Sequence, residues 1–282
     1  MPQFKQITIV GLGLIGGSLG MAAKRRHLAR EVVGLSRSRS TIREAVKRRA
    51  IDRGTTDPRE AVRNAELVIL ATPVDAIVPS ATRLARLMRP GSILTDVGST
   101  KARLVGTLTG SLPNRIAFVG AHPIAGSEQR GIAAACAELF DESCCIVTPT
   151  SRTSPRALSS VRRFWRALGC EVVAMSPARH DALLARTSHL PHLLAYSLSL
   201  TAPGARVCTP RSFLDMTRIA KSDPDLWDDI VLTNREQLLA AIEAFDRHWR
   251  KLRRLLVRRD RTALRRFLAQ AKAHRDALNS SE

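Results

Sequence analysis

Short apolar runs alternate with helix-like stretches along the first 176 residues of the chain. Apolar runs bounded by turn signals are typical of buried strands, and their alternation with helices is typical of a parallel α/β sheet. We therefore predict strands at Ile7–Val10, Val32–Leu35, Leu67–Ala71, Ile93–Asp96 and Phe118–Ala121. Two further runs, Cys145–Thr148 and Glu171–Ala174, are expected to extend the same sheet.

The pattern becomes helical after Ser176-Pro177 and stays helical to the end of the chain. Apolar residues then recur at spacings of three and four, as at Leu238, Ile242, Phe245, Trp249, Leu252 and Leu256. We predict an α/β domain at residues 1–176 and an all-helical domain at 177–282. The helical domain can bury its apolar positions against its own sheet or against a second copy of the chain, and we favour a homodimer.

Charge and composition narrow the class of protein. The chain has 45 basic and 25 acidic residues, a net charge of +20, with basic clusters at Lys24–Arg53 and Arg247–Arg275. Such a charge attracts nucleic acid or anionic small molecules. Only 4% of the residues are aromatic, and known nucleic-acid-binding motifs are missing, which argues against nucleic acid.

The same composition indicates where the protein works. We expect no membrane span and no signal peptide, because apolar runs are short and the first strand begins by Ile7. The five cysteines are odd in number and form no C-x-x-C pair, so we expect reduced thiols, no metal site and a cytoplasmic protein.

A glycine-rich turn directly follows the first predicted strand. Gly11, Gly13 and Gly16 enclose Leu12, Leu14 and Ile15, and a helix follows. Glycines at this spacing permit a tight turn and let the backbone approach a pyrophosphate at the amino end of the helix. This context predicts a Rossmann domain that binds a dinucleotide.

The end of the second strand bears on the choice of cofactor. Enzymes specific for NAD usually carry Asp or Glu there to bind the ribose 2′-hydroxyl. This chain has Ser36 and Arg37 instead, a hydroxyl and a guanidinium suited to a 2′-phosphate. We predict a preference for NADP, with NAD as the alternative, and Arg37 as a plain surface residue is the competing interpretation. Thr72 and Pro73 resemble the loop that lies over the nicotinamide ribose in such domains.

Candidate catalytic residues follow two later strands. His122 comes after the apolar run Ile116–Val119, which would place an imidazole at the carboxyl edge of the sheet, where open α/β folds bind ligands. Ser99 and Lys101, after the fourth strand, are expected to face the same site, although Ser99 could instead only cap a helix.

Two clusters in the helical domain complete the candidate site. Ser188–His192 contains His189, which is either structural or a ligand of the substrate, and His192. Thr217–Trp227 contains Arg218. An arginine opposite two imidazoles, His122 and His192, suits a small carboxylate substrate.

With these residues in view, the chain resembles the prephenate and arogenate dehydrogenases of tyrosine biosynthesis over nearly its whole length. The resemblance rests on the glycine loop 11–16, Asp96–Lys101, the His122 segment, Ser188–His192 and Thr217–Pro224. It implies a Rossmann domain, a helical dimerisation domain and a site between them.

The resemblance also implies individual roles. His122 would hold the ring hydroxyl and accept its proton, Ser99 would support that hydroxyl and His122, and Arg218 would bind the ring carboxylate. His192 would line the pocket with Ser127 and Trp227, and His189 lies in the same matching segment.

The tail of the substrate stays open at this stage. Glu128 resembles the pattern of prephenate-using enzymes, whereas Ser36-Arg37 is similar to NADP-dependent arogenate enzymes. Leu214 stands where the family often has a basic residue, for which Arg211 could compensate. We favour prephenate. The rival readings are a 3-hydroxyacid dehydrogenase or imine reductase, which usually lack Ser188–His192, and a nucleic-acid-binding protein on a decayed nucleotide fold.

Overall fold

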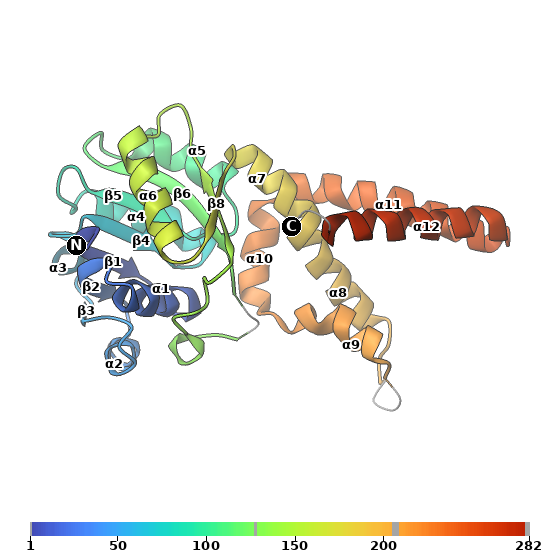
Figure 1. The fold of residues 1–282 in the computed structure, drawn as a ribbon, viewed down its shortest axis with the longest axis horizontal. Coiled ribbons are helices and arrows are strands. Elements are labelled where there is room, and N and C mark those ends of the chain that lie inside the picture. The colour runs from blue at the N-terminus through green and yellow to red at the C-terminus, as the bar shows by residue number, and fades with distance from the viewer. Residues whose placement is uncertain (1, 127–128, 205–208, 280–282) are drawn as a thin grey trace. The chain divides into compact units, whose positions relative to one another are not determined.

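The computed structural model describes residues 2–126, 129–204 and 209–279. The chain forms two compact units, Met1–Asn234 and Arg235–Glu282 (Figure 1). Because the first unit runs on to Asn234, the assignment of 1–176 and 177–282 as separate domains stays a prediction.

An eight-stranded sheet in the order β3-β2-β1-β4-β5-β6-β7-β8 forms the centre of the first unit. The first six strands of this order are all parallel and have the arrangement of a dinucleotide-binding Rossmann fold. The strands are β1 Phe4–Val10, β2 Ala29–Leu35, β3 Arg53–Thr55, β4 Leu67–Leu70, β5 Ile93–Asp96, β6 Ala117–Ile124, β7 Cys144–Thr148 and β8 Glu171–Ala174.

Besides small shifts in where several strands begin or end, the sheet differs from the prediction in three respects. Strand β3 lacks an apolar run and was not predicted. Strand β7 pairs antiparallel with β6, so the sheet is mixed. The predicted end of β6 at Ala121 is wrong, because pairing with β7 extends the strand to Ile124 and includes His122.

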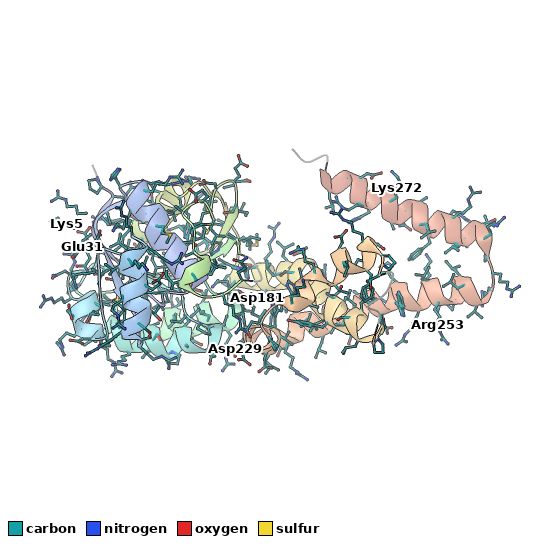
Figure 2. The ribbon with its side chains drawn as sticks, turned by 90° about the horizontal axis from the view of Figure 1, so that it is seen from below. Lys5, Glu31, Asp181, Asp229, Arg253 and Lys272 are labelled. Atoms are coloured by element: carbon teal, nitrogen blue, oxygen red, sulfur yellow. The ribbon has the colours of Figure 1, made fainter. Side chains whose placement is uncertain are left out.

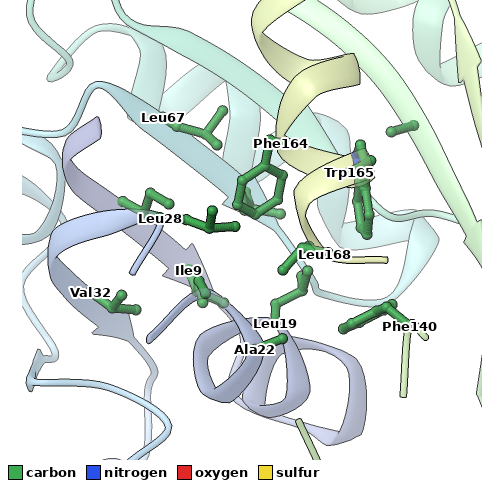
Figure 3. Packing of buried hydrophobic residues seen from close by; sticks show 14 of the residues in the cluster. Ile9, Leu19, Ala22, Leu28, Val32, Leu67, Phe140, Phe164, Trp165 and Leu168 are labelled. Carbon is green, nitrogen blue, oxygen red and sulfur yellow. The ribbon is translucent and has the colours of Figure 1, made fainter. Parts of the chain in front are cut away.

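Helices cover both faces of the sheet. Helices α1 and α6 pack on one face around a core that includes Leu19, Phe164 and Trp165 (Figure 3). Helices α3, α4 and α5 cover the other face. These helices and α2 are α1 Leu14–Arg25, α2 Arg39–Lys47, α3 Pro58–Val62, α4 Val74–Ala85, α5 Ala102–Ser111 and α6 Pro155–Ala167.

After β8 the described elements are all helical, as the spacing of apolar residues predicts. Each of α7 and α10 begins with a proline after a capping side chain, Ser176 or Asp223. The elements are α7 Pro177–Leu184, the π-helical turn η2 Ala185–His189, α8 Leu190–Leu200, α9 Arg211–Thr217, the 3₁₀ turn η3 Arg218–Lys221 and α10 Pro224–Thr233.

The second unit consists of α11 (Arg235–Val257) and α12 (Arg261–Asn279), which pack side by side (Figure 1). The predicted apolar spacing lies on α11, where Phe245 and Trp249 stack with ring centroids 6.0 Å apart. Within the described ranges no helix is long and apolar enough to cross a membrane. The four described cysteines are free thiols, and Cys208 lies outside the described residues.

Candidate active site

The turn between β1 and α1 has the geometry of a dinucleotide cradle. A Cβ atom on Gly16 would lie 1.9 Å from the carbonyl oxygen of Gly11, and one on Gly11 would lie 2.5 Å from that of Ala71. Both glycines are therefore needed for the turn itself. A Cβ atom on Gly13 would meet no described atom within 4 Å, so space is open beside the amino end of α1. Leu14 and Ile15 form the first turn of that helix.

Two neighbouring segments border this cradle. The backbone N–H of Gly11 donates to the carbonyl of Leu35, which places Ser36 and Arg37 beside the glycine turn. Arg37 is exposed, and the hydroxyl of Ser36 accepts from the backbone N–H of Ser38.

On the other side, the methyl group of Thr72 would lie 3.2 Å from a Cβ atom on Gly11. The hydroxyl of Thr72 is buried and has no hydrogen-bond partner in the described part of the chain. Pro73 is the residue before α4. An open helix end free of acidic side chains in its first turn, together with an unpartnered buried hydroxyl, fits a bound dinucleotide.

His122 lies on β6, three residues beyond the last pair that β6 makes with β5, at Val119. It therefore lies at the carboxyl edge of the parallel part of the sheet. Its ring Nδ1 is 2.9 Å from Nε2 of His180, on α7. Burial lowers the pKa of His122 well below 6.5, and the neighbouring His180 and Lys101 lower that pKa further. His122 is thus a neutral imidazole near neutral pH, which is the state a general base needs.

His180 belongs to a hydrogen-bonded chain that continues into the helical part of the unit. Its Nδ1 is 2.7 Å from Oδ1 of Asp181, whose carboxylate also accepts the backbone N–H groups of Lys101 and Ala102, each at 2.8 Å. The side chain of Asn234 donates to the backbone carbonyl of Asp181 at 2.9 Å. Figure 2 labels Asp181 between the sheet and the following helices.

Ser99 and Lys101, the two candidates that follow β5, differ in how far they are buried. Ser99 is half-buried after β5, and the amino end of α5 is capped by Asp181, so another residue fills the capping role that the sequence also allowed for Ser99. The expectation that Lys101 faces the site stays a prediction. Its side chain is fully buried and pairs with the carboxylate of Asp96, which needs a counter-ion in the interior.

The helices supply a second group of ring side chains. The imidazole of His192 stacks on Trp227, with ring centroids 3.5 Å apart, and its Nδ1 donates to the carbonyl of Ser188 at 3.0 Å. Burial lowers the pKa of His192, and the charge of Arg218 lowers it further, so these two groups lie near each other. Tyr196 ties α8 to the segment after Arg218 by donating to the carbonyl of Ser222.

His189 is buried, 1% exposed, with its ring edge toward Trp227. Its Nδ1 lies 3.1 Å from the side-chain amide nitrogen of Asn234, which donates to it. His189 also lies near enough to His122 for its charge to affect the pKa of that residue. Ser127 and Glu128 lie outside the described residues.

Sequence reasoning missed His180, Asp181 and Asn234. The adjacent His-Asp pair in the first turns of α7, shortly after Ser176-Pro177, is a signal that the sequence does show. The structure buries both side chains. Nothing in the local pattern of Asn234 distinguishes it.

Cofactor cradle and neutral imidazole together define the class of protein: an NAD(P)-dependent oxidoreductase with a Rossmann domain. Comparisons with known proteins give the family. Family models described as "Prephenate dehydrogenase, nucleotide-binding domain" and "Prephenate dehydrogenase, dimerization domain" match residues 19–174 and 176–270. The chain is 37% identical to the cyclohexadienyl dehydrogenase of Zymomonas mobilis, over 99% of this chain and 98% of that protein.

Solved structures agree with these matches. The prephenate dehydrogenase of A. aeolicus, in complex with hydroxyphenyl propionate and NAD+, superposes with a TM-score of 0.90 at 34% identity over 97% of this chain and 98% of that one. The arogenate dehydrogenase of Synechocystis gives 0.83 at 30% identity over 97% and 99%. The chain belongs to the prephenate dehydrogenase family.

Proposed function

We propose that the protein catalyses the oxidative decarboxylation of prephenate to 4-hydroxyphenylpyruvate, with hydride transfer to NAD(P), in tyrosine biosynthesis. The observation that carries this proposal is the neutral imidazole of His122. It lies at the carboxyl edge of a Rossmann sheet, with Nδ1 engaged by His180, so Nε2 is the ring nitrogen left for a substrate.

The residues of the site divide the work. Nε2 of His122 accepts the proton of the ring hydroxyl, while Ser99 supports that hydroxyl. Arg218 binds the ring carboxylate, and His192 stacked on Trp227 forms a wall of the pocket with His189. Ser127, outside the described residues, is proposed as a further substrate-binding residue. Bound NAD(P) supplies the hydride acceptor. Loss of the carboxylate as CO2 leaves an aromatic ring, which makes the reaction effectively irreversible.

We also propose that the cofactor is NADP. Ser36 and Arg37 lie beside the glycine turn, where a guanidinium can pair with a 2′-phosphate. Gly11, Gly13 and Gly16 would hold the pyrophosphate at the amino end of α1, and Thr72 and Pro73 would border the nicotinamide ribose. Arg37→Ala is expected to raise KM for NADP about tenfold and leave KM for NAD within about twofold. Arg43→Ala, on exposed α2, is the control, and a wild-type preference for NAD that Arg37→Ala leaves unchanged would overturn this part.

The substrate tail is the second open choice. Leu214 is 55% exposed, and Arg211 pairs with Asp215 on its own helix, 3.9 Å between Nε and Oδ2. Arogenate, which carries an amino-acid tail in place of the keto acid, is the second candidate because no basic residue stands at position 214. The likeness to the Synechocystis arogenate dehydrogenase supports the same candidate.

One assay tests the reaction. The protein is mixed with NADP or NAD and either prephenate or arogenate, and the absorbance of the reduced cofactor is followed. We expect turnover with prephenate. His122→Asn should lower kcat by about 100-fold or more, because the base is lost. No signal with either substrate would overturn the proposal, and full turnover by His122→Asn would show that the base is another group.

We also propose a cytoplasmic homodimer formed through the helical domain, and the match to a family model described as a dimerization domain supports the homodimer.

A further inference from the structure

Behind His122 lies a buried series of hydrogen-bonded side chains. Three side chains, His122, His180 and Asp181, are joined in series by hydrogen bonds of 2.9 and 2.7 Å. They come from β6 and from the start of α7, and His180 is fully buried. A series of this kind ends at a carboxylate and begins at the imidazole that faces the substrate.

Asp181 determines which atom donates in each hydrogen bond of the series. Its carboxylate accepts the backbone N–H groups of Lys101 and Ala102 at the start of α5, and a carboxylate can only accept hydrogen bonds. Nδ1 of His180 must therefore carry the proton between His180 and Asp181. Burial lowers the pKa of His180, so this ring is neutral and its Nε2 is an acceptor.

The same donor and acceptor assignment extends to His122. Because Nε2 of His180 accepts, Nδ1 of His122 must carry a proton and donate it across the 2.9 Å contact. A neutral imidazole has only one N–H, so Nε2 of His122 keeps a free lone pair. That is the nitrogen from which a proton can be accepted.

We propose that the His180–Asp181 dyad is a positioning pair that locks His122 in the Nδ1–H tautomer and thereby reserves its Nε2 as the base. The proposal rests on the proposed function for the role of His122, but the tautomer exists without substrate. Neither residue of the dyad touches the reacting atoms.

The surroundings make the dyad rigid. Asn234 at the end of α10 donates to the backbone carbonyl of Asp181. The backbone N–H of Lys101 donates to the carboxylate of Asp181, while its side chain pairs with Asp96. When His122 gains a proton, its hydrogen bond to His180 becomes charge-assisted, with the carboxylate of Asp181 behind it. The dyad thus keeps Nδ1 of His122 protonated both before and after Nε2 accepts a proton.

Long-range ¹H–¹⁵N spectra of histidine-labelled protein test the tautomer directly. The chain has seven histidines, and the signals of His122 are those missing in His122→Asn. At pH 8, without substrate, we expect Nδ1 of His122 to be protonated and Nε2 bare in the wild type. A wild-type spectrum with the proton on Nε2 of His122 would overturn the proposal.

Two variants of one residue separate tautomer control from simple packing. His180→Leu fills the space but removes the acceptor, so Nε2–H should appear on His122. His180→Gln offers a side-chain oxygen to Nδ1 of His122 and should restore the wild-type tautomer. His248→Gln, on exposed α11, is the control and should leave the His122 signals unchanged.

Kinetics should follow the spectra. We expect His180→Leu to lower kcat with prephenate by about 10- to 100-fold while KM changes less than about twofold, and His180→Gln to recover most of the loss. Equal kcat in His180→Leu and wild type would overturn the proposal. If His180→Leu does not fold, the wild-type spectrum and His180→Gln still decide. A correct tautomer without turnover on either substrate would refute the proposed function alone.

Discussion

Burial makes His189 a source of acid sensitivity as well as a wall of the candidate pocket. Burial is the main cause that lowers its pKa to about 4 from 6.5, and Asn234 donates to its Nδ1, which favours the neutral ring. Between pH 6.5 and 4 the unfolded chain therefore binds a proton at this position that the folded chain does not. The stability conferred by neutral His189 is complete above pH 6.5 and is lost as the pH falls toward 4.

His189→Gln should remove this sensitivity. We expect the free energy of unfolding of the wild type to fall by about 2 kcal/mol more than that of His189→Gln between pH 7 and pH 5. Urea unfolding at the two pH values measures the difference, with His248→Gln as the control for loss of an exposed imidazole. Parallel falls in wild type and variant would show that His189 does not titrate in this range.

At the scale of single residues, sequence reasoning selects those with a local signature. His122 follows an apolar run before a proline, and Arg218 stands in a dense polar segment, so both are visible in the chain. His180 meets His122 across 58 residues, and its burial depends on how α7 packs against β6. Such a pairing exists only after folding, and no spacing rule reveals it.

The turn between β1 and α1 shows how an element combines folding and binding. Gly16 is required for the turn, because its Cβ would lie 1.9 Å from a backbone oxygen, whereas Gly13 faces open space. Gly13 has a φ of −83° that alanine also adopts. Its role is therefore expected to be the close approach of the cofactor.

The two glycines should respond differently to alanine. Gly16→Ala is expected to lower the free energy of unfolding by about 2 kcal/mol or more, because the turn must shift. Gly13→Ala should keep wild-type stability and lose about tenfold or more in affinity for NAD(P), because the new methyl group occupies the space of the pyrophosphate. Urea unfolding and calorimetric titration of the cofactor measure the two effects. Unchanged affinity in Gly13→Ala would place the pyrophosphate elsewhere.

Helices α4 and α10 meet through two carboxyl groups. Burial raises the pKa of Asp229, and the charge of Asp75 and a hydrogen bond with it raise that pKa further. Figure 2 labels Asp229. Between pH 3.8 and the raised pKa the folded chain binds more protons at this site than the unfolded chain. Stability therefore falls as the pH rises through that window, and the cost is complete above it.

Asp229→Asn should relieve this cost, because the amide donates to Asp75 without a charge. We expect the variant to melt about 2 °C higher than the wild type at pH 7 and to lose that advantage at pH 4 and below. Thermal unfolding followed by circular dichroism measures both values. Asp75→Asn should have a similar effect, and the double variant should gain no more than either single one. Additive gains would mean that the two groups do not interact.

Elements were predictable where the pattern is local. Five parallel strands and the long helix α11 follow from apolar runs and from spacings of three and four. Strand β3 has only three residues and no apolar run, so its pairing with β2 depends on tertiary contacts. The antiparallel direction of β7 is not visible in its apolar run, because parallel and antiparallel strands can both have one.

The whole molecule carries a charge of +20, and its basic residues suit anionic ligands such as a dinucleotide phosphate and a dicarboxylate substrate. That nucleic acid is not a partner stays a prediction, which the low aromatic content supports. Fold class was accessible from sequence because alternating strands and helices permit few arrangements. Association between copies was predicted only as the favoured of two alternatives, because an apolar helix face looks the same whether the same chain or another covers it.

The mass of the protein in solution tests whether two copies of the chain associate. The helices α11 and α12 expose Trp249 at 57%, Leu256 at 57% and Leu268 at 54%, and the matching family model describes a dimerization domain. We expect light scattering to give about twice 30.9 kDa for the wild type. Trp249→Asp with Leu256→Asp should shift the protein to a monomer, because charges on a buried face cost desolvation. Val46→Asp, an exposed apolar position on α2, should leave the mass unchanged. A wild-type monomer would refute the homodimer.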